Sequence, residues 1–140
     1  MLTEERVLEI LKKAGVLLDG HFLLTSGKHS DHYLQCAYIF RHPEYSEELC
    51  AALAEQFQDD QVDVVIGPAM GAVQMAYEVS RALHCENFFA ERQDGIMTLR
   101  RGFEVKPGMR VLLVEDVITT GGSVKEVYDL VKKAGGVVVG

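Results

Sequence analysis

Hydrophobic residues recur at helical spacing in several parts of the chain. Near its start, Thr3 is placed to cap a helix and Gly15 to end it. The expected apolar face of this helix carries Val7, Leu8, Ile10, Leu11 and Ala14. The same spacing predicts further helices over residues 44–58, 71–83 and 123–134.

Short runs of β-branched and aromatic residues lie between these helices and predict strands. The segment FLLTSGKHSDHYLQC is interpreted as two short strands around a turn at residues 26–28. Later runs are VDVVI, ENFFAE, the hairpin-like IMTL, MRVLLVE (109–115) and VVV. MRVLLVE has few polar positions, as in a strand covered on both faces. The order of elements predicts an α/β fold with a doubly wound parallel sheet, whose ligands bind at the carboxyl ends of the strands.

Length and composition fit one domain with a sizeable core, since 48% of the 140 residues are apolar and 25% are charged. The longest apolar runs are interrupted by Asp63, Gly67 and Glu115, so none reaches membrane-spanning length. The three cysteines are odd in number and lack CxxC spacing. We interpret them as reduced thiols of a cytoplasmic protein rather than as disulfides or a zinc site.

The chain is acidic, with a formal net charge of −7. This charge argues against a general nucleic-acid or membrane-surface binder, whose affinity would come from a basic field. It remains compatible with a small anionic substrate, because such a ligand needs only a local group of cations and backbone N–H groups.

The segment VLLVEDVITTGGSVKEV (111–127) carries the main candidate chemistry. Gly121 and Gly122 let the backbone turn sharply and approach a ligand closely. The helix that follows offers unpaired N–H groups and a partial positive charge. Hydroxyl groups come from Thr119, Thr120 and Ser123. Together these features predict a cradle for a phosphate monoester.

Two carboxylates precede this turn and change its interpretation. Glu115 and Asp116 do not suit phosphate, but they suit vicinal hydroxyls or a cation that accompanies the phosphate. A ribose phosphate has both kinds of group. A P-loop would need a lysine after the glycines, and a dinucleotide-binding turn would place its acid about twenty residues later. The plainer alternative is a strand-to-helix turn whose hydroxyls only cap the helix, which the adjoining acid pair disfavours.

Three motifs, in family order, resemble those of type I phosphoribosyltransferases and of orotate phosphoribosyltransferases in particular. VLLVEDVITTGGS resembles the phosphoribosyl-diphosphate signature of the type I enzymes. FLLTSGKHSDHY resembles the N-terminal F-x-L-x-S-G-x-x-S segment of the orotate enzymes, and IGPAMGAV resembles their pyrophosphate-side loop. The resemblance implies transfer of phosphoribose from 5-phosphoribosyl 1-diphosphate to orotate, with Mg²⁺, giving orotidine 5′-monophosphate and pyrophosphate. It also implies a homodimer and a single domain over residues 1–140, in which 1–40 form a hood of helix and short strands.

Carried over position by position, the resemblance assigns roles to particular residues. Glu115 and Asp116 would hold the ribose hydroxyls, with Mg²⁺ bound near them through the substrate pyrophosphate. Thr119 would also contact orotate. The phosphoribosyl-diphosphate site would comprise Glu115, Asp116, Val117, Ile118, Thr119, Thr120, Gly121, Gly122 and Ser123. Contacts from the covering loop or with pyrophosphate are expected from Lys28, Ala69, Met70, Gly71, Arg92, Arg100 and Arg101.

The chain also departs from the family pattern. Thr25 and Gly71 stand where many members have lysine. The segment ERQDGIMTLRRGFE is shorter than the usual covering loop and has no lysine, so its paired arginines are candidates for the missing charge. The last strand begins just before Gly140, ahead of the place where the family has an orotate-contacting arginine, and we therefore expect a chain shortened at its C-terminus.

Two other functions stay open at this point. One is phosphoribosyl transfer to another base, such as a purine; the other is a non-catalytic regulator that binds phosphoribosyl diphosphate. The SGKHSDHY segment favours orotate. The acidic charge disfavours a regulator that acts on nucleic acid.

Overall fold

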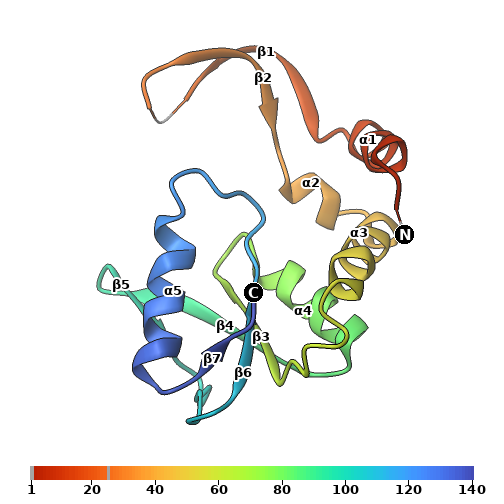
Figure 1. Cartoon of the computed structure of the whole chain (residues 1–140). Helices are drawn as coiled ribbons and strands as arrows, with labels where there is room; N and C mark the ends of the chain where they lie inside the picture. Colours follow the sequence, from red (N-terminus) through yellow and green to blue (C-terminus); the bar gives the residue numbers. More distant parts are fainter. Residues whose placement is uncertain (1, 25) are drawn as a thin grey trace. The chain divides into compact units, whose positions relative to one another are not determined.

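The computed structural model describes residues 2–24 and 26–140, which form two compact units (Figure 1). The first unit ends at Leu49 and the second begins at Cys50. No helix within the described ranges is both long and apolar enough to cross a membrane. Of the predicted site residues that are described, only Lys28 lies in the first unit.

The first unit combines helices with a hairpin. Its elements are α1 (Glu4–Lys13), β1 (Leu17–Leu23), β2 (His29–Leu34), α2 (Ala37–Phe40) and the start of α3 (Pro43–Glu55). α1 begins as predicted, because Oγ1 of Thr3 accepts a hydrogen bond from the N–H of Arg6 at 3.1 Å. β1 and β2 pair antiparallel, which confirms the predicted hairpin. α2 was not predicted, since a single helical turn shows no periodicity.

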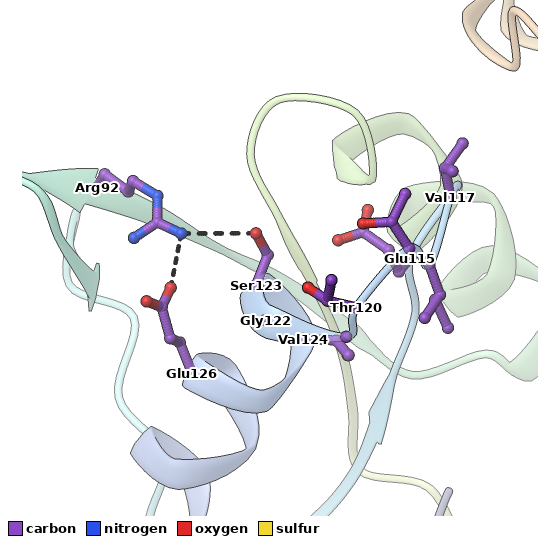
Figure 2. A pocket seen from close by; sticks show the side chains of 11 residues that line it. Arg92, Glu115, Val117, Thr120, Gly122, Ser123, Val124 and Glu126 are labelled. Carbon is purple, nitrogen blue, oxygen red and sulfur yellow. Dashed lines mark hydrogen bonds and ion pairs between the residues drawn. The ribbon is translucent and has the colours of Figure 1, made fainter. Parts of the chain in front are cut away.

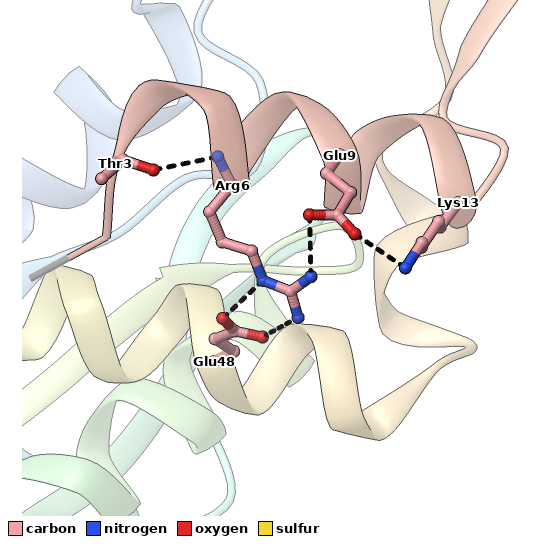
Figure 3. Close-up of polar contacts among 5 residues, drawn as sticks. All are labelled: Thr3, Arg6, Glu9, Lys13 and Glu48. Atoms are coloured by element: carbon pink, nitrogen blue, oxygen red, sulfur yellow. Dashed lines mark hydrogen bonds and ion pairs between the residues drawn. The ribbon is translucent and has the colours of Figure 1, made fainter.

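Arg6 joins α1 to α3 within the first unit (Figure 3). Its Nε and Nη2 each donate a 2.8 Å hydrogen bond to the carboxylate of Glu48. Its Nη1 lies 3.2 Å from Glu9, which also pairs with Lys13 at 2.7 Å. Hydrogen bonds to Glu48 and then Glu9 raise the pKa of Arg6. The two-pronged geometry fixes the contact between the two helices more firmly than a single ion pair would.

The second unit is built on a five-stranded sheet in the order β5-β4-β3-β6-β7. Its strands are β3 (Val64–Pro68), β4 (Glu86–Gln93), β5 (Ile96–Leu99), β6 (Arg110–Leu113) and β7 (Val137–Val138). All neighbours are parallel except β5, which forms the predicted hairpin with β4. The helices are α4 (Val73–Leu83) and α5 (Gly122–Lys133). This topology confirms the predicted α/β class with a largely parallel sheet.

Helices cover both faces of this sheet. Val64 and Ile66 of β3 pack with Val127 and Val131 of α5 in one buried core. Val65 points to the opposite face because side chains alternate along a strand, and α4 lies on that side of the sheet (Figure 1). All of β3 is buried, which explains why its sequence is apolar without alternation.

β6 ends at Leu113, earlier than the end predicted at residue 115. The N–H of Val114 still donates to the carbonyl of Ile66 at 3.1 Å, but the chain then leaves the sheet. Glu115 and Asp116 therefore lie in the loop that follows the strand. The apolar run continues through Val114, so the pattern could not place this boundary.

Candidate active site

Two loops meet at the carboxyl ends of the adjacent strands β3 and β6. The strands are parallel, with Val64 opposite Val111, so both end at the same edge of the sheet. The first loop follows Pro68, and its Ala69 N–H donates to the carbonyl of Ala90 at 2.6 Å. The second loop, residues 114–121, leads into α5. This edge is where parallel α/β sheets bind their ligands.

A cavity of about 220 Å³ lies beside the second loop (Figure 2). Its lining residues are Arg92, Glu115, Val117, Ile118, Thr119, Thr120, Gly121, Gly122, Ser123, Val124 and Glu126. The fold therefore gathers the predicted sugar-phosphate segment, Asp116 excepted, together with Arg92. We call residues 119–123 the phosphate cradle.

The N-terminus of α5 forms one wall of the cavity. Gly121 precedes the helix with φ 80° and ψ 9°, a left-handed conformation that favours glycine. No side chain of the described residues caps this helix, so its first N–H groups are available to a ligand. A Cβ added at Gly122 would lie 3.5 Å from Oγ1 of Thr120, an ordinary contact distance. These features together suit a phosphate monoester.

Glu115 supplies a carboxyl group of unusual pKa at the edge of the cavity. Burial is the main cause, followed by a hydrogen bond with Asp116, and together they raise the pKa of Glu115 to about 7. The N–H of Asp116 donates to Oε1 of Glu115 at 3.1 Å. At neutral pH both forms of this carboxyl are populated, so a ligand that donates hydrogen bonds to it favours the ionised form.

Asp116 does not line the cavity. Its carboxylate lies against Gly71 of the first loop instead. Ala69 and Met70 belong to the same loop, and Met70 is 86% exposed. The predicted pyrophosphate-side residues are therefore next to the predicted ribose-binding acid, although they lie in a different segment of the chain.

Arg92 reaches the cavity from the end of β4 (Figure 2). Its Nη2 lies 2.7 Å from Oε2 of Glu126 and 3.5 Å from Oγ of Ser123. Its Nη1 donates to the carbonyl of Gly95 at 3.3 Å. The guanidinium group is thus held between the β4–β5 hairpin and the first turns of α5.

The other predicted cations lie elsewhere. Nε of Arg101 donates to Glu91 at 2.8 Å, and Nη1 of Arg100 lies 3.5 Å from the same carboxylate. The hydrogen bond from Arg101 is the main cause that lowers the pKa of Glu91. Neither arginine lines the cavity. Lys28 is exposed at the turn between β1 and β2, and Thr25 is outside the described residues.

Sequence reasoning missed two residues of this cavity, Val124 and Glu126. Glu126 follows Ser123 by three positions on α5, so both lie on one face of the helix. That spacing was visible in the sequence, but a helical glutamate is normally part of a solvated face. Its contact with Arg92 depends on how β4 lies beside α5.

Comparison with known proteins identifies close relatives. Residues 39–140 match the family described as phosphoribosyl transferase domain. The orotate phosphoribosyltransferase of Pelotomaculum thermopropionicum is 57% identical over 139 residues, which are 99% of this chain and 73% of that protein. That of Caldanaerobacter subterraneus is 58% identical with the same coverage.

Solved structures share the fold at lower identity. The orotate phosphoribosyltransferase from Aeropyrum pernix superimposes with a TM-score of 0.79 at 23% identity, covering 94% of this chain and 76% of that one. An adenine phosphoribosyltransferase from Rhodothermus marinus gives a TM-score of 0.75 at 22% identity, covering 98% and 84%. Since enzymes named for different bases fit almost equally well, the fold alone does not identify the base.

Proposed function

This chain belongs to the orotate phosphoribosyltransferases of the phosphoribosyl transferase domain family, and we propose from that premise how its residues carry out the reaction. The enzyme transfers phosphoribose from 5-phosphoribosyl 1-diphosphate to orotate, giving orotidine 5′-monophosphate and pyrophosphate in pyrimidine biosynthesis. The relatives confirm the expectation of orotate over a purine base, and of an enzyme over a non-catalytic regulator.

The observation that carries the proposed roles is the uncapped N-terminus of α5 inside the cavity. The 5-phosphate would accept hydrogen bonds from the N–H groups of residues 121–123 and from the hydroxyl groups of Thr119 and Thr120. These backbone donors are fixed before the substrate arrives, so binding orders few groups. The helix dipole adds attraction for the anion.

Glu115 and Asp116 would accept hydrogen bonds from the vicinal ribose hydroxyls. When the bond at ribose C1 breaks, positive charge develops on the sugar ring and negative charge on pyrophosphate. Ionised carboxylates beside the ribose stabilise the positive charge that develops on the sugar ring. Removal of one such preorganised contact typically raises the activation barrier by about 3–4 kcal/mol. Ribose hydroxyls that donate to Glu115 would also favour its ionised form, in spite of its raised pKa.

Mg²⁺ fits this site as an ion that arrives with the pyrophosphate. In the ranges that the structure describes, no group of three or more His, Cys, Asp or Glu residues could hold a metal. Mg²⁺ keeps an octahedral shell of oxygens, several of them usually from water and substrate phosphates, so Glu115 and Asp116 need not complete it. When bound, the ion offsets the charge on the leaving group. Ala69, Met70 and Gly71 would lie against the pyrophosphate.

The remaining roles are proposed from the resemblance. Thr119 would contact orotate, and Lys28, Arg100 and Arg101 would supply positive charge when the site closes over its substrates. We also propose a homodimer and a cytoplasmic location, the latter because the sequence has an odd number of cysteines without CxxC spacing. We propose no nucleic-acid or membrane partner for this acidic chain.

The test is consumption of orotate in the presence of phosphoribosyl diphosphate and Mg²⁺, run beside adenine, hypoxanthine and uracil. Of the four bases, we expect turnover only of orotate, and we expect that turnover to be lost when Mg²⁺ is chelated. Gly122→Val protein, whose cradle is filled by a side chain, serves as the inactive control. Turnover of a purine at a rate equal to that of orotate would contradict the proposed specificity.

A further inference from the structure

Arg92 and Glu126 form an ion pair at the edge of the phosphate cradle (Figure 2). The side chains are 44% and 45% exposed, so this pair adds little to the stability of the fold. A carboxylate at this place would by itself repel a phosphate, since Glu126 lines the same cavity as Ser123. Neither stability nor simple charge complementarity therefore accounts for Glu126.

The contacts of Arg92 indicate what Glu126 does. The contact of Nη2 with Oγ of Ser123 is long, at 3.5 Å, whereas that with Glu126 is short, at 2.7 Å. Glu126 is therefore the main anchor of the guanidinium group, and the carbonyl of Gly95 is a second one at 3.3 Å. Among the described residues, the Nε–H and one Nη1–H of Arg92 have no partner and remain available to a ligand.

We propose that Glu126 is a positioning residue that holds Arg92 beside the phosphate cradle of its own chain, where Arg92 binds the 5-phosphate of the sugar substrate. The identity of the sugar rests on the proposed function; the phosphate contact does not. Glu126 acts through Arg92 and touches no substrate atom. The proposal also assigns Arg92 to the 5-phosphate rather than to pyrophosphate or to the site of a partner chain.

The direct test is calorimetric titration with ribose 5-phosphate, which measures the affinity of the phosphate cradle for its ligand without any turnover. We expect Arg92→Ala to weaken this affinity about tenfold, the loss of roughly one charge-assisted hydrogen bond. Glu126→Ala should weaken it by a similar factor, because the freed arginine is no longer oriented. The double variant should bind no worse than Arg92→Ala, since Glu126 acts only through Arg92.

Conservative and distant variants separate positioning from general damage. Glu126→Gln keeps an oxygen that can accept a hydrogen bond from Arg92. We expect this variant to retain more affinity for ribose 5-phosphate than Glu126→Ala does. Asp129→Ala removes an exposed carboxylate from the same helix, which pairs with Lys125 and does not line the cavity, and should bind normally. Thermal unfolding of every variant should stay close to that of the parent, and the KM for orotate should not change.

An experiment with mixed dimers tests whether Arg92 serves the site of its own chain. Arg92→Ala chains and Asp116→Asn chains, dissociated and reassociated together, should show no more activity than the two proteins kept apart. Recovery above that sum would show that Arg92 serves a neighbouring chain and would overturn the assignment.

Three results of the titrations would overturn the positioning role. They are unchanged or tighter binding of ribose 5-phosphate by Glu126→Ala, additive losses in the double variant, and failure of the parent protein to bind ribose 5-phosphate. If ribose 5-phosphate binding depends on both residues while orotate is not consumed, the positioning role stands and the proposed function falls.

Discussion

A Cβ atom added to Gly71 would lie 2.8 Å from both carboxylate oxygens of Asp116. This is closer than side chains approach in folded proteins, so a larger residue at position 71 requires the carboxylate to move. Gly71 is not among the glycines with positive φ, which means that the restriction is steric rather than conformational. The proposed pyrophosphate-side loop and the proposed ribose-binding acid are thus packed directly together.

Replacing Gly71 by alanine should therefore act through Asp116. We expect Gly71→Ala to displace that carboxylate and to raise the KM for phosphoribosyl diphosphate about tenfold, a loss of roughly 1.4 kcal/mol. Steady-state kinetics with both substrates would measure it. The control is the double variant with Asp116→Asn, in which the alanine should add little further loss. Independent, additive losses would show that Gly71 acts in another way.

Gly122 offers the complementary test, because the protein itself leaves room for a side chain there. Among the described residues, an added Cβ would contact only Oγ1 of Thr120, at an ordinary distance of 3.5 Å. Gly122→Val should thus fold normally while its methyl groups occupy the space of the phosphate. Calorimetry should show no binding of phosphoribosyl diphosphate, with an intermediate affinity for Gly122→Ala. Unchanged affinity in a folded Gly122→Val protein would remove the phosphate cradle from consideration.

The local parts of this site could be predicted from the sequence. The apolar run before Glu115, the glycine turn and the helix that follows are all encoded within residues 111–127, so pattern reasoning could predict the turn and the helix N-terminus that line the cavity. The same reasoning predicted a strand over residues 62–66 and a helix over 71–83, whereas β3 runs from Val64 to Pro68 and α4 begins at Val73. It erred where tertiary contacts decide, as in the early end of β6.

The remaining relationships join segments that are far apart in the chain. Gly71 meets Asp116 only because β3 and β6 are neighbours in the sheet. Arg92 meets Glu126 only because the end of β4 lies beside α5. The charges of Arg100 and Arg101 looked equivalent to that of Arg92 in the sequence, yet both bind Glu91 outside the cavity.

The raised pKa of Glu115 predicts a conflict between stability and activity. In the folded chain burial raises this pKa from 4.5 to about 7, so the native state holds a proton that the unfolded state releases at lower pH. Stability contributed by Glu115 therefore falls as pH rises from about 4.5 to about 7. Glu115→Gln avoids this loss, and without substrate or Mg²⁺ its unfolding temperature at pH 8 should exceed that of the parent by about 2 °C.

At pH 4 the two proteins should unfold at the same temperature, because Glu115 is then protonated in both states. The Glu115→Gln variant should nevertheless turn over more slowly, since a neutral glutamine cannot stabilise the positive charge that develops on the ribose. Circular dichroism melts across this pH range and steady-state kinetics would measure the two effects. A lower unfolding temperature for Glu115→Gln at pH 8 would contradict the raised pKa.

Arg100 and Arg101 lead to a prediction about the proposed homodimer. Their side chains are 46% and 61% exposed and both pair with Glu91, outside their own cavity. We expect them to serve the site of the partner chain, in contrast to Arg92. Protein with both arginines replaced by alanine should then recover activity when its chains are mixed with Asp116→Asn chains.

The size of this recovery can be calculated. In a mixed dimer, the chain with intact Asp116 receives intact arginines from its partner, so one of the two sites is normal. Random reassociation of equal amounts makes about half of the dimers mixed, so the mixture should reach about a quarter of parental activity. Sedimentation analysis would confirm that dimers form, and mass spectrometry would confirm that they exchange chains. Exchange without recovery would show that these arginines do not complete a neighbouring site, because every mixed dimer would otherwise contain one fully equipped set of residues.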